Sequence, residues 1–429
     1  MPIAGLPPRS RLDALADPDA FHWATGIENT VIADPARGGR TLDEYELTGH
    51  YEHHKEDLAR VVDLRVDCVR YGVPWQLANP APGRFDFALA DDAFGQLLAG
   101  GVEPIMDLVH YGTPAWLERG FLDPDYPARV AEYAAATAER FRGRIRWYTP
   151  LNEPRITAWY CGRLGWWPPY ARGWSGFVAV MLGVCRGIRA TARALLAVDP
   201  EIVLAHVDAT DLYEPAQPAA SADAELRQRL VFLALDLLTG RVDSGHPLHA
   251  WLRRHGASAT ELDEFLAAPL ALDLVGINLY PMFTWKRVER SGRRLRIRMQ
   301  YAGPELLERL AHLYFDRYRR PLFVTETAST GRRRRPWLEG SVAAVRRLRA
   351  EGIPVVGYTW WPLFSLVAWA YRQGLRPREE YVLRMGLYEL DLSPGAGLAR
   401  RTTPLVETYR ALASAGVAPV GRLAPGGEA

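Results

Sequence analysis

Two glutamates stand where they could carry out acid–base chemistry. Glu153 follows an apolar run in TPLNEP, and Glu326 follows another in FVTETAS. A glutamate at the end of such a run is costly to bury unpaired, so each needs either an ion-pair role or a catalytic one. Two carboxyl groups, one protonated and one ionised, could protonate a departing oxygen and stabilise an oxocarbenium-like carbon, as glycosidic bond cleavage requires. An ion pair could explain either glutamate alone, but a shared rim for both would favour catalysis.

The segments around these glutamates predict a single (β/α)₈ barrel. Short runs rich in β-branched and aromatic residues alternate with amphipathic helical stretches, the pattern of a parallel sheet built from βα units. The expected strands are 22–27, 68–75, 104–110, 145–152, 202–208, 272–280, 321–327 and 354–361. The expected helices are 52–64, 88–100, 127–141, 176–198, 222–239, 303–318, 338–351 and 402–415. Eight such units without a linker predict one α/β TIM barrel over 18–415, with an N-terminal extension over 1–17 and a flexible tail over 416–429.

Barrel enzymes place their sites at the carboxyl ends of the strands, so polar and aromatic residues there are candidates. They are Arg70, His110, Asn152, Asp208, Asn278, Tyr280, Trp360 and Trp361. Arg70 could instead pair with a structural acid, His110 could be a hydrogen-bonded core histidine, and Tyr280 could only pack. Only one of the two adjacent tryptophans can face the barrel mouth, since neighbours on a strand point to opposite faces. Asp208 is expected to be structural or to belong to a subsite.

The chain resembles glycoside hydrolase family 1, the retaining β-glycosidases. The likeness runs from about residue 18 to residue 415, through HYEHHKEDLARVVDLRVDCVRYGVPW, LLAGGVEPIMDLVHYGTPAWL, TPLNEP, LDLVGINLYP, FVTETAS, GYTWWPLFSLVAW, RMGLYELDL and RRTTPLVETYR in family order. An Asn-Glu-Pro after a strand is moderately specific, whereas the ordered set is strong.

The resemblance implies roles for these residues. Glu153 would be the general acid/base, and Glu326 the nucleophile, kept ionised by Arg70 and the Tyr280 hydroxyl. Asn152 would hold the sugar 2-hydroxyl. The remaining implied substrate-binding residues are His110, Asn278, and Trp361 as a stacking platform. The aromatic stretch 159–174 could line an aglycone site or simply pack its loop.

Two positions depart from the family pattern. Where the family has a glutamine after the first strand, this chain has Asn29 with Glu28 beside it, and Ala368 stands where the family has a glutamate. Those two family residues hold the sugar's 3-, 4- and 6-hydroxyls, so ordinary glucose or galactose should be recognised poorly. A deoxy sugar would make an alanine acceptable. An anionic sugar would need nearby cations, for which Arg372, Arg376 and Arg378 are available, although a surface loop is the simpler interpretation.

The composition excludes other classes of protein. A formal charge of +2 in 429 residues gives no support for a nucleic-acid partner. The arginine-rich segments 288–299 and 332–335 are expected to be solvated faces or loops. Neither a signal peptide nor a membrane span is expected, and three widely spaced cysteines suggest buried thiols in a reducing, cytoplasmic compartment. Lys55 and Lys286 are the only lysines among 52 basic residues.

The sequence therefore predicts a retaining β-glycosidase acting on a small glycoside or glycoconjugate, with no metal and no organic cofactor. No glycine-rich phosphate-binding motif stands between a strand and a helix. A transglycosidase would use the same glutamates, and a barrel protein that binds carbohydrate without turnover is the alternative from another class. The sugar, the aglycone, the pathway and the oligomeric state are not readable from the chain.

Overall fold

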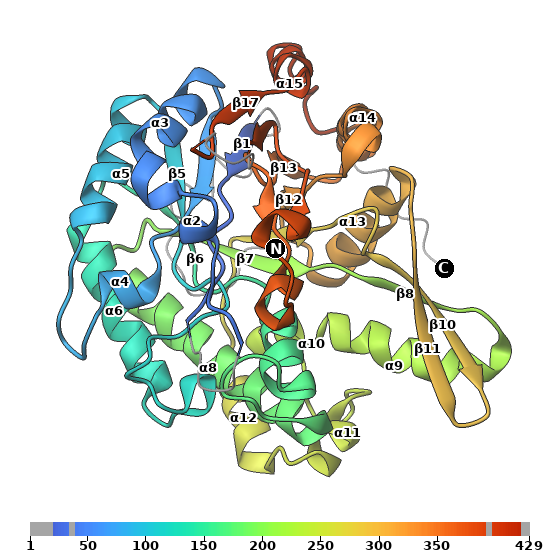
Figure 1. Ribbon diagram of the computed structural model, residues 1–429. Helices are drawn as coiled ribbons and strands as arrows, with labels where there is room; N and C mark the ends of the chain where they lie inside the picture. The colour runs from blue at the N-terminus through green and yellow to red at the C-terminus, as the bar shows by residue number, and fades with distance from the viewer. Residues whose placement is uncertain (1–19, 34–38, 392–396, 422–429) are drawn as a thin grey trace.

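Eight parallel strands close into one barrel in the computed structural model, which describes residues 20–33, 39–391 and 397–421 (Figure 1). The barrel order is β1-β13-β12-β9-β7-β6-β5-β4. The strands are β1 His22–Gly26, β4 Cys68–Tyr71, β5 Glu103–Asp107, β6 Trp147–Thr149, β7 Val203–Ala209, β9 Leu274–Asn278, β12 Leu322–Thr327 and β13 Val355–Trp360. All eight expected strands are present, so the predicted (β/α)₈ barrel is confirmed. The predicted extension 1–17 lies outside the described residues.

Helices surround the barrel and bury their apolar faces against it. The long ones are α3 His50–Asp63, α5 Ala88–Ala99, α6 Tyr126–Arg140, α8 Gly173–Val198, α9 Ser221–Val231, α13 Glu305–Tyr318, α14 Arg334–Ala350 and α15 Leu405–Ser414. A short helix, α10 Leu233–Leu238, follows α9. The shorter ones are α2 Glu44–Leu47, α4 Trp75–Ala78, α7 Pro154–Ala158, α11 His249–Arg254 and α12 Ala259–Ala267. The single helix expected over 222–239 is divided into α9 and α10 at Phe232.

Inside the barrel, inward-pointing side chains form a separate apolar core. Its members are Ala24, Cys68, Ile105, Trp147, Val203, Ala205, Leu274, Phe323 and Val356. The three cysteines are free and buried, as expected. Among the described residues one helix, α8, could cross a membrane by length and composition alone, and 67% of its most apolar window is buried inside the protein. That burial is typical of a core helix.

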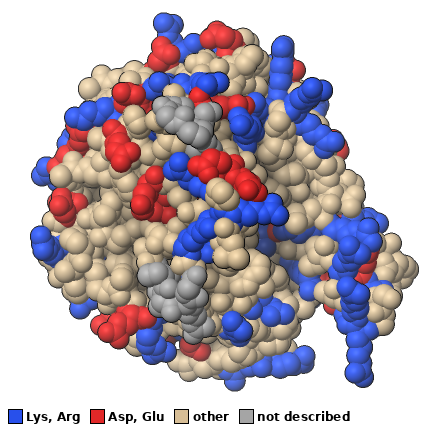
Figure 2. Space-filling view, viewed as in Figure 1, with Lys and Arg blue, Asp and Glu red and all other residues tan. Residues whose placement is uncertain are grey.

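The basic segment 288–299 forms a β-hairpin, so of the two expected possibilities, a solvated face or a loop, it is the solvated face of a sheet. Strands β10 Trp285–Ser291 and β11 Arg294–Gln300 pair with each other, and β10 continues onto β8 Leu212–Pro215. On β11, Arg294, Arg296 and Arg298 are exposed while Leu295 and Ile297 are half-buried, so the alternation of arginine with apolar residues was a strand signal. The hairpin projects from the barrel on the right of Figure 1, and its basic side chains mark that projection in Figure 2.

Six further short strands and the last described residues lie outside the barrel sheet. The strands are β2 Val31–Ile32, β3 Leu42–Asp43, β14 Leu366–Val367, β15 Val382–Leu383, β16 Tyr388–Leu390 and β17 Arg400–Thr402. Residues 416–421, where the predicted tail begins, lie against α14. There Arg349 Nε donates to the Ala418 carbonyl at 2.8 Å, and the Gly421 N–H donates to the Arg349 carbonyl at 2.7 Å. The run 332–335 belongs to the turn and first residues of α14, where it is mostly exposed, as expected for a solvated face.

Candidate active site

Glu153 lies in a strained turn between β6 and α7. Its φ is +46°, in the left-handed region that non-glycine residues rarely occupy, and Pro154 begins α7 directly after it. The Glu153 N–H donates to the Val207 carbonyl of β7 at 3.1 Å, which ties the turn to the neighbouring strand. Backbone strain of this kind is common at functional sites, where the surrounding structure fixes the direction of one side chain. Here it presents the carboxyl group to a cavity at the barrel mouth.

The surroundings of Glu153 favour its protonated form. Burial and the negative charge of Glu326 raise the pKa of Glu153 to about 7. Two donors oppose that rise: Asn278 Nδ2 donates to Oε1 at 2.8 Å, and the Tyr111 hydroxyl donates to Oε2. A carboxyl group with a pKa near neutrality can both give and take a proton at neutral pH.

Glu326 has a contrasting environment at the end of β12. The Arg70 guanidinium donates to its Oε1, and the Tyr280 hydroxyl donates to its Oε2 at 2.7 Å. Burial, together with the charge of Glu28, raises the pKa of Glu326 above its usual value. The positive charge of Arg70 opposes this rise, with smaller opposing contributions from His110 and the Tyr280 hydrogen bond. Because Glu326 has a paired cation and Glu153 has none, the shared proton resides on Glu153.

Arg70 also organises the residues behind Glu326. It is fully buried, and its second terminal nitrogen donates to Asp107 Oδ2 and to Asn152 Oδ1, both at 2.7 Å. Asn152, expected to hold a sugar hydroxyl, is fully buried and does not line the cavity. Its Nδ2 lies 3.1 Å from His110 Nε2, so in this structure it positions neighbouring side chains.

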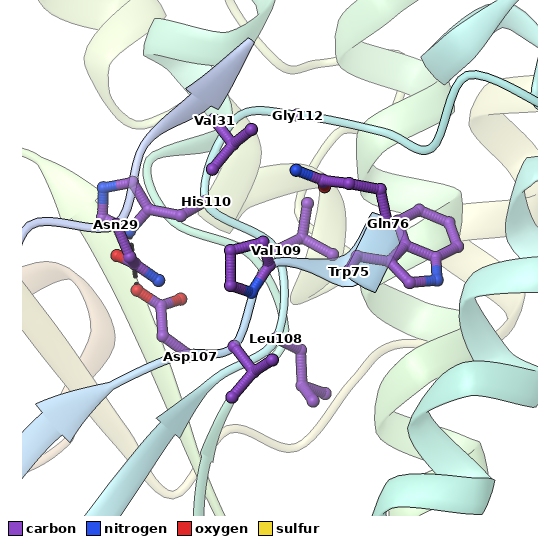
Figure 3. A pocket seen from close by; sticks show the side chains of 11 residues that line it. Asn29, Val31, Trp75, Gln76, Asp107, Leu108, Val109, His110 and Gly112 are labelled. Carbon is purple, nitrogen blue, oxygen red and sulfur yellow. Dashed lines mark hydrogen bonds and ion pairs between the residues drawn. The ribbon is translucent and has the colours of Figure 1, made fainter. Parts of the chain in front are cut away.

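His110 is held by a carboxylate that the sequence did not reveal. Its Nδ1 lies 2.7 Å from Asp107 Oδ2, a link visible in Figure 3 beside Asn29. Burial lowers the pKa of His110, but the charges of Asp107 and Glu28 outweigh this effect and the net pKa is raised. His110 lines the main cavity.

Glu28 and Asn29, expected together in the sugar site, lie in different places. Glu28 lines the main cavity, and Asn29 lines a separate small pocket with Val31 and Trp75 (Figure 3). Adjacent residues of an extended segment point in opposite directions, and the irregular chain after β1 hid which of the two points inward. Glu28 Oε2 accepts from Trp361 Nε1 at 3.0 Å, while its Oε1 accepts from the Thr30 hydroxyl at 2.5 Å.

Trp361 does not form an open stacking platform, contrary to expectation. It is fully buried, with the His110 ring parallel to it at 5.7 Å and the Arg70 guanidinium 4.8 Å from its ring centroid. Trp369 lines the cavity instead, and Trp360 donates its Nε1 to the Met385 carbonyl at 3.0 Å within the core. Trp361 therefore positions Glu28 through the hydrogen bond from its Nε1.

The main cavity measures about 550 Å³. It brings together six of the expected site residues, namely Glu28, His110, Glu153, Asn278, Tyr280 and Glu326. Ala368 lies in an apolar wall with Leu366, Leu383 and Met385. Arg372, Arg376 and Arg378 are not among the lining residues, and Arg372 donates to the backbone carbonyls of Ile32 and Arg40, so they do not meet a sugar here.

Several lining residues escaped the sequence interpretation. Tyr111 follows His110 directly, and its contact with Glu153 depends on a φ of +72° that no spacing rule predicts. Within the stretch 159–174, Trp159 and Tyr160 line the cavity while Trp167 is fully buried. Asp208 is fully buried and lies outside the cavity lining.

Over the described ranges no group of three or more His, Cys, Asp or Glu residues could hold a metal ion.

Replacing Tyr111 with phenylalanine should raise the pKa of Glu153, because the hydroxyl stabilises the carboxylate form. The alkaline limb of the kcat/KM profile should then move upward by up to about one pH unit, the equivalent of one hydrogen bond. Tyr148→Phe is the matched control, since within the described chain the Tyr148 hydroxyl has no hydrogen-bond partner and is buried. An unmoved limb in Tyr111→Phe would contradict the assigned hydrogen bond.

A closed parallel barrel with two buried glutamates of contrasting environment at its mouth is an arrangement that glycosidic bond cleavage can use. The model of glycosyl hydrolase family 1 matches residues 40–233. An aryl-phospho-β-D-glucosidase of Bacillus subtilis is 21% identical over 399 residues, 79% of this chain and 81% of that protein. Beta-glucosidase 47 of Arabidopsis thaliana is 24% identical over 426 residues, covering 84% and 74% of the two chains. Over residues 40–233 the chain is thus similar to glycosyl hydrolase family 1, and its relatives support a glycosidase.

Comparison of structures agrees on the fold. The family 1 β-glucosidase of Thermotoga maritima superposes with a TM-score of 0.78 at 19% identity, covering 93% of this chain and 99% of that one. At this identity the likeness establishes the barrel architecture and says nothing of the substrate.

Proposed function

We propose that this protein is a retaining β-glycosidase that hydrolyses a small β-linked glycoside by double displacement. The observation that supports this most is the contrast at one cavity between Glu326, paired with Arg70, and Glu153, whose pKa is raised to about 7. One ionised and one protonated carboxyl group are the two parts that the reaction needs.

In the first step, Glu326 attacks the anomeric carbon while Glu153 transfers its proton to the glycosidic oxygen. The bond from carbon to the departing oxygen breaks, and an ester between the sugar and Glu326 forms. Arg70 and Tyr280 hold the attacking carboxylate in place through both of its oxygens. A positioned general acid contributes about 10²- to 10⁴-fold in rate.

In the second step, Glu153 acts as the base. It takes a proton from a water molecule, which attacks the anomeric carbon and breaks the ester to Glu326. Two inversions at that carbon leave the product with the configuration of the substrate. As the sugar leaves, Glu326 is again ionised beside Arg70 and Glu153 again protonated.

The wall around Ala368 favours a sugar that is apolar at its outer edge. Ala368, Leu366, Leu383 and Met385 offer no side-chain hydrogen-bond acceptor where the family holds the outer hydroxyls. A hydroxyl buried there would lose its water without gaining a partner, whereas a methyl group would not. One relative, 29% identical over 172 residues (33% of this chain and 36% of that protein), is the bifunctional β-D-glucosidase/β-D-fucosidase of Bifidobacterium breve. A 6-deoxy sugar such as β-D-fucose therefore suits the cavity better than its 6-hydroxy counterpart.

Aryl β-glycosides test this function directly. We expect aryl β-D-fucoside to be hydrolysed with a kcat/KM about ten-fold or more above the galactoside, which differs only at carbon 6, because one unpaired buried hydroxyl costs about 1–3 kcal/mol. Proton NMR of the first-formed sugar should show the β anomer. Ala368→Gln should lower the fucoside-to-galactoside ratio by offering a hydrogen-bond partner to the 6-hydroxyl. The same change at Ala99, which is exposed at the end of α5 and outside the cavity lining, should leave the ratio unchanged.

Three outcomes would contradict the proposal. Release of the α anomer would mean inversion and would exclude Glu326 as a nucleophile. Transfer of the sugar to an added acceptor alcohol, with no free sugar, would identify a transglycosidase. Sugar binding without turnover of any fucoside, xyloside, glucoside, glucuronide or 6-phosphoglucoside would indicate a carbohydrate-binding barrel.

A further inference from the structure

The cavity contains a second charged cluster, separate from the two glutamates. Arg155 and Lys286 both donate to Asp211 Oδ2, Arg155 at 2.6 Å, and all three residues line the cavity. Their side chains are 5%, 17% and 7% exposed, so the cluster is largely shielded from water. The Tyr213 hydroxyl lies 3.4 Å from the same oxygen.

This cluster lies in the same cavity as the proposed acid, and we assign it to the leaving-group side of the scissile bond. Arg155 follows the proposed acid Glu153 by two residues on α7, and Lys286 belongs to β10 of the projecting hairpin. The residues that hold Glu326 come from the barrel itself. The group that departs with the proton from Glu153 therefore faces Arg155 and Lys286.

The cluster has more positive than negative charge facing the cavity. Two cations share one carboxylate, and the other acidic lining residues, Glu28, Glu153 and Glu326, are engaged by partners of their own. Asp208 also interacts electrostatically with Arg155, but it is fully buried and outside the lining. Arg155 Nε has no hydrogen-bond partner within the described part of the chain. An anionic group placed beside Arg155 and Lys286 would accept charge-assisted hydrogen bonds from them.

Apolar side chains surround the cluster. Phe283 and Met299 line the cavity and are 41% and 59% exposed, unusual values for large hydrophobic side chains. Ile297 and Trp159 extend the same surface. A leaving group that fits must bring an apolar skeleton to these residues as well as its charge.

The choice of lysine rather than arginine at position 286 fits a confined anion site. Lys286 is one of two lysines among 52 basic residues, and the other, Lys55, is 68% exposed on α3. An ammonium group is a compact point charge with freely oriented donors, whereas a guanidinium is a broad planar fork. A confined corner already occupied by Arg155 suits the smaller cation.

We propose that Arg155 and Lys286 form an anion-recognition site for the leaving group, so that the preferred substrates are glycosides of apolar, chiefly aromatic, alcohols bearing a carboxylate or a similar acidic substituent. This inference rests on the proposed glycosidase function and adds the chemical class of the aglycone. The carboxylate accepts hydrogen bonds from Lys286 Nζ and Arg155, and its ring packs against Phe283 and Met299.

Matched aryl glycosides test the site. The β-glycosides of 3-hydroxybenzoate and 3-hydroxybenzamide, on the sugar that the enzyme hydrolyses best, differ in charge but hardly in shape. We expect a kcat/KM ratio of acid to amide of about ten or more in the native protein, falling as salt is added. Lys286→Met should bring the ratio close to one, and Lys286→Arg should retain part of the preference. Lys55→Met, the same substitution at the exposed lysine, should leave both rates unchanged.

Each result decides the question. Because the ratio is taken within one protein preparation, loss of folded protein cancels out of it. A native ratio near one overturns the inference while leaving the glycosidase function intact, as does a ratio that Lys286→Met does not alter. If no glycoside is cleaved, the proposed function fails. The site is then tested by calorimetric binding of free 3-hydroxybenzoate and 3-hydroxybenzamide, where equal affinities overturn it and a preference for the acid that Lys286→Met removes supports it.

Discussion

Glu326→Ala should lose turnover by roughly 10⁴-fold or more, because the covalent route requires a carboxylate at that place. The protein should remain folded, since Arg70 keeps Asp107 and Asn152 as acceptors. Added azide should restore part of the activity by entering the space left by the side chain. The product should then be the glycosyl azide of inverted configuration, because only one displacement takes place.

A second substitution, Glu326→Gln, should lower the pKa of Glu153 by removing the neighbouring negative charge. Burial and the negative charge of Glu326 together raise the pKa of Glu153 to about 7, so removing that charge should lower the pKa, while burial keeps it above the ordinary value of a glutamate. Carbon-13 NMR titration of labelled glutamate in Glu326→Gln measures this without any turnover. Glu305, on α13 outside the cavity lining, provides an internal reference signal. An unchanged Glu153 titration would show that the two carboxyl groups do not share one site.

Glu153→Gln should lower kcat/KM about 10²- to 10⁴-fold for substrates whose leaving group needs a proton. Aryl glycosides of strongly acidic phenols need no proton from Glu153, so the rate of their first step should be little changed. Phenol should then be released in a burst while the sugar ester on Glu326 accumulates. Azide, which needs no base, should speed its release and give a glycosyl azide of retained configuration.

The pH profile provides a second measurement of Glu153. The native rate should fall above about pH 7, as the acid becomes ionised, and this limb should disappear in Glu153→Gln. An equal loss for all leaving groups, with the alkaline limb unchanged, would assign the limb to another residue and Glu153 to a positioning role.

The fold could be predicted from the sequence because its signals are local and repeated. Each of the eight apolar runs predicts one strand and each of the eight amphipathic stretches predicts helical structure. The eight strands then close into one barrel. The hairpin was missed because the arginines of β11 were interpreted by composition, although they alternate with apolar residues. The break at Phe232 between α9 and α10 gives no proline or glycine signal.

The site could be predicted best for residues at or just after the carboxyl ends of the barrel strands. Glu326 and Asn278 are two of them, and strand pairing sets them side by side in neighbouring strands. Position alone did not decide between Glu28 and Asn29, because the chain after β1 is irregular and its alternation is lost. Lys286 and Asp211 belong to separate segments that only the folded chain brings together.

The two walls of the cavity have different origins, which bears on how this enzyme could diversify. The carboxyl pair is anchored in the closed barrel, where a change disturbs hydrogen-bonded neighbours on both sides. Lys286, Ile297 and Met299 belong instead to a hairpin joined to the rest of the sheet through β8 alone. Mutation or recombination can therefore replace this hairpin and change which aglycones bind, while the two glutamates and their hydrogen bonds stay unchanged.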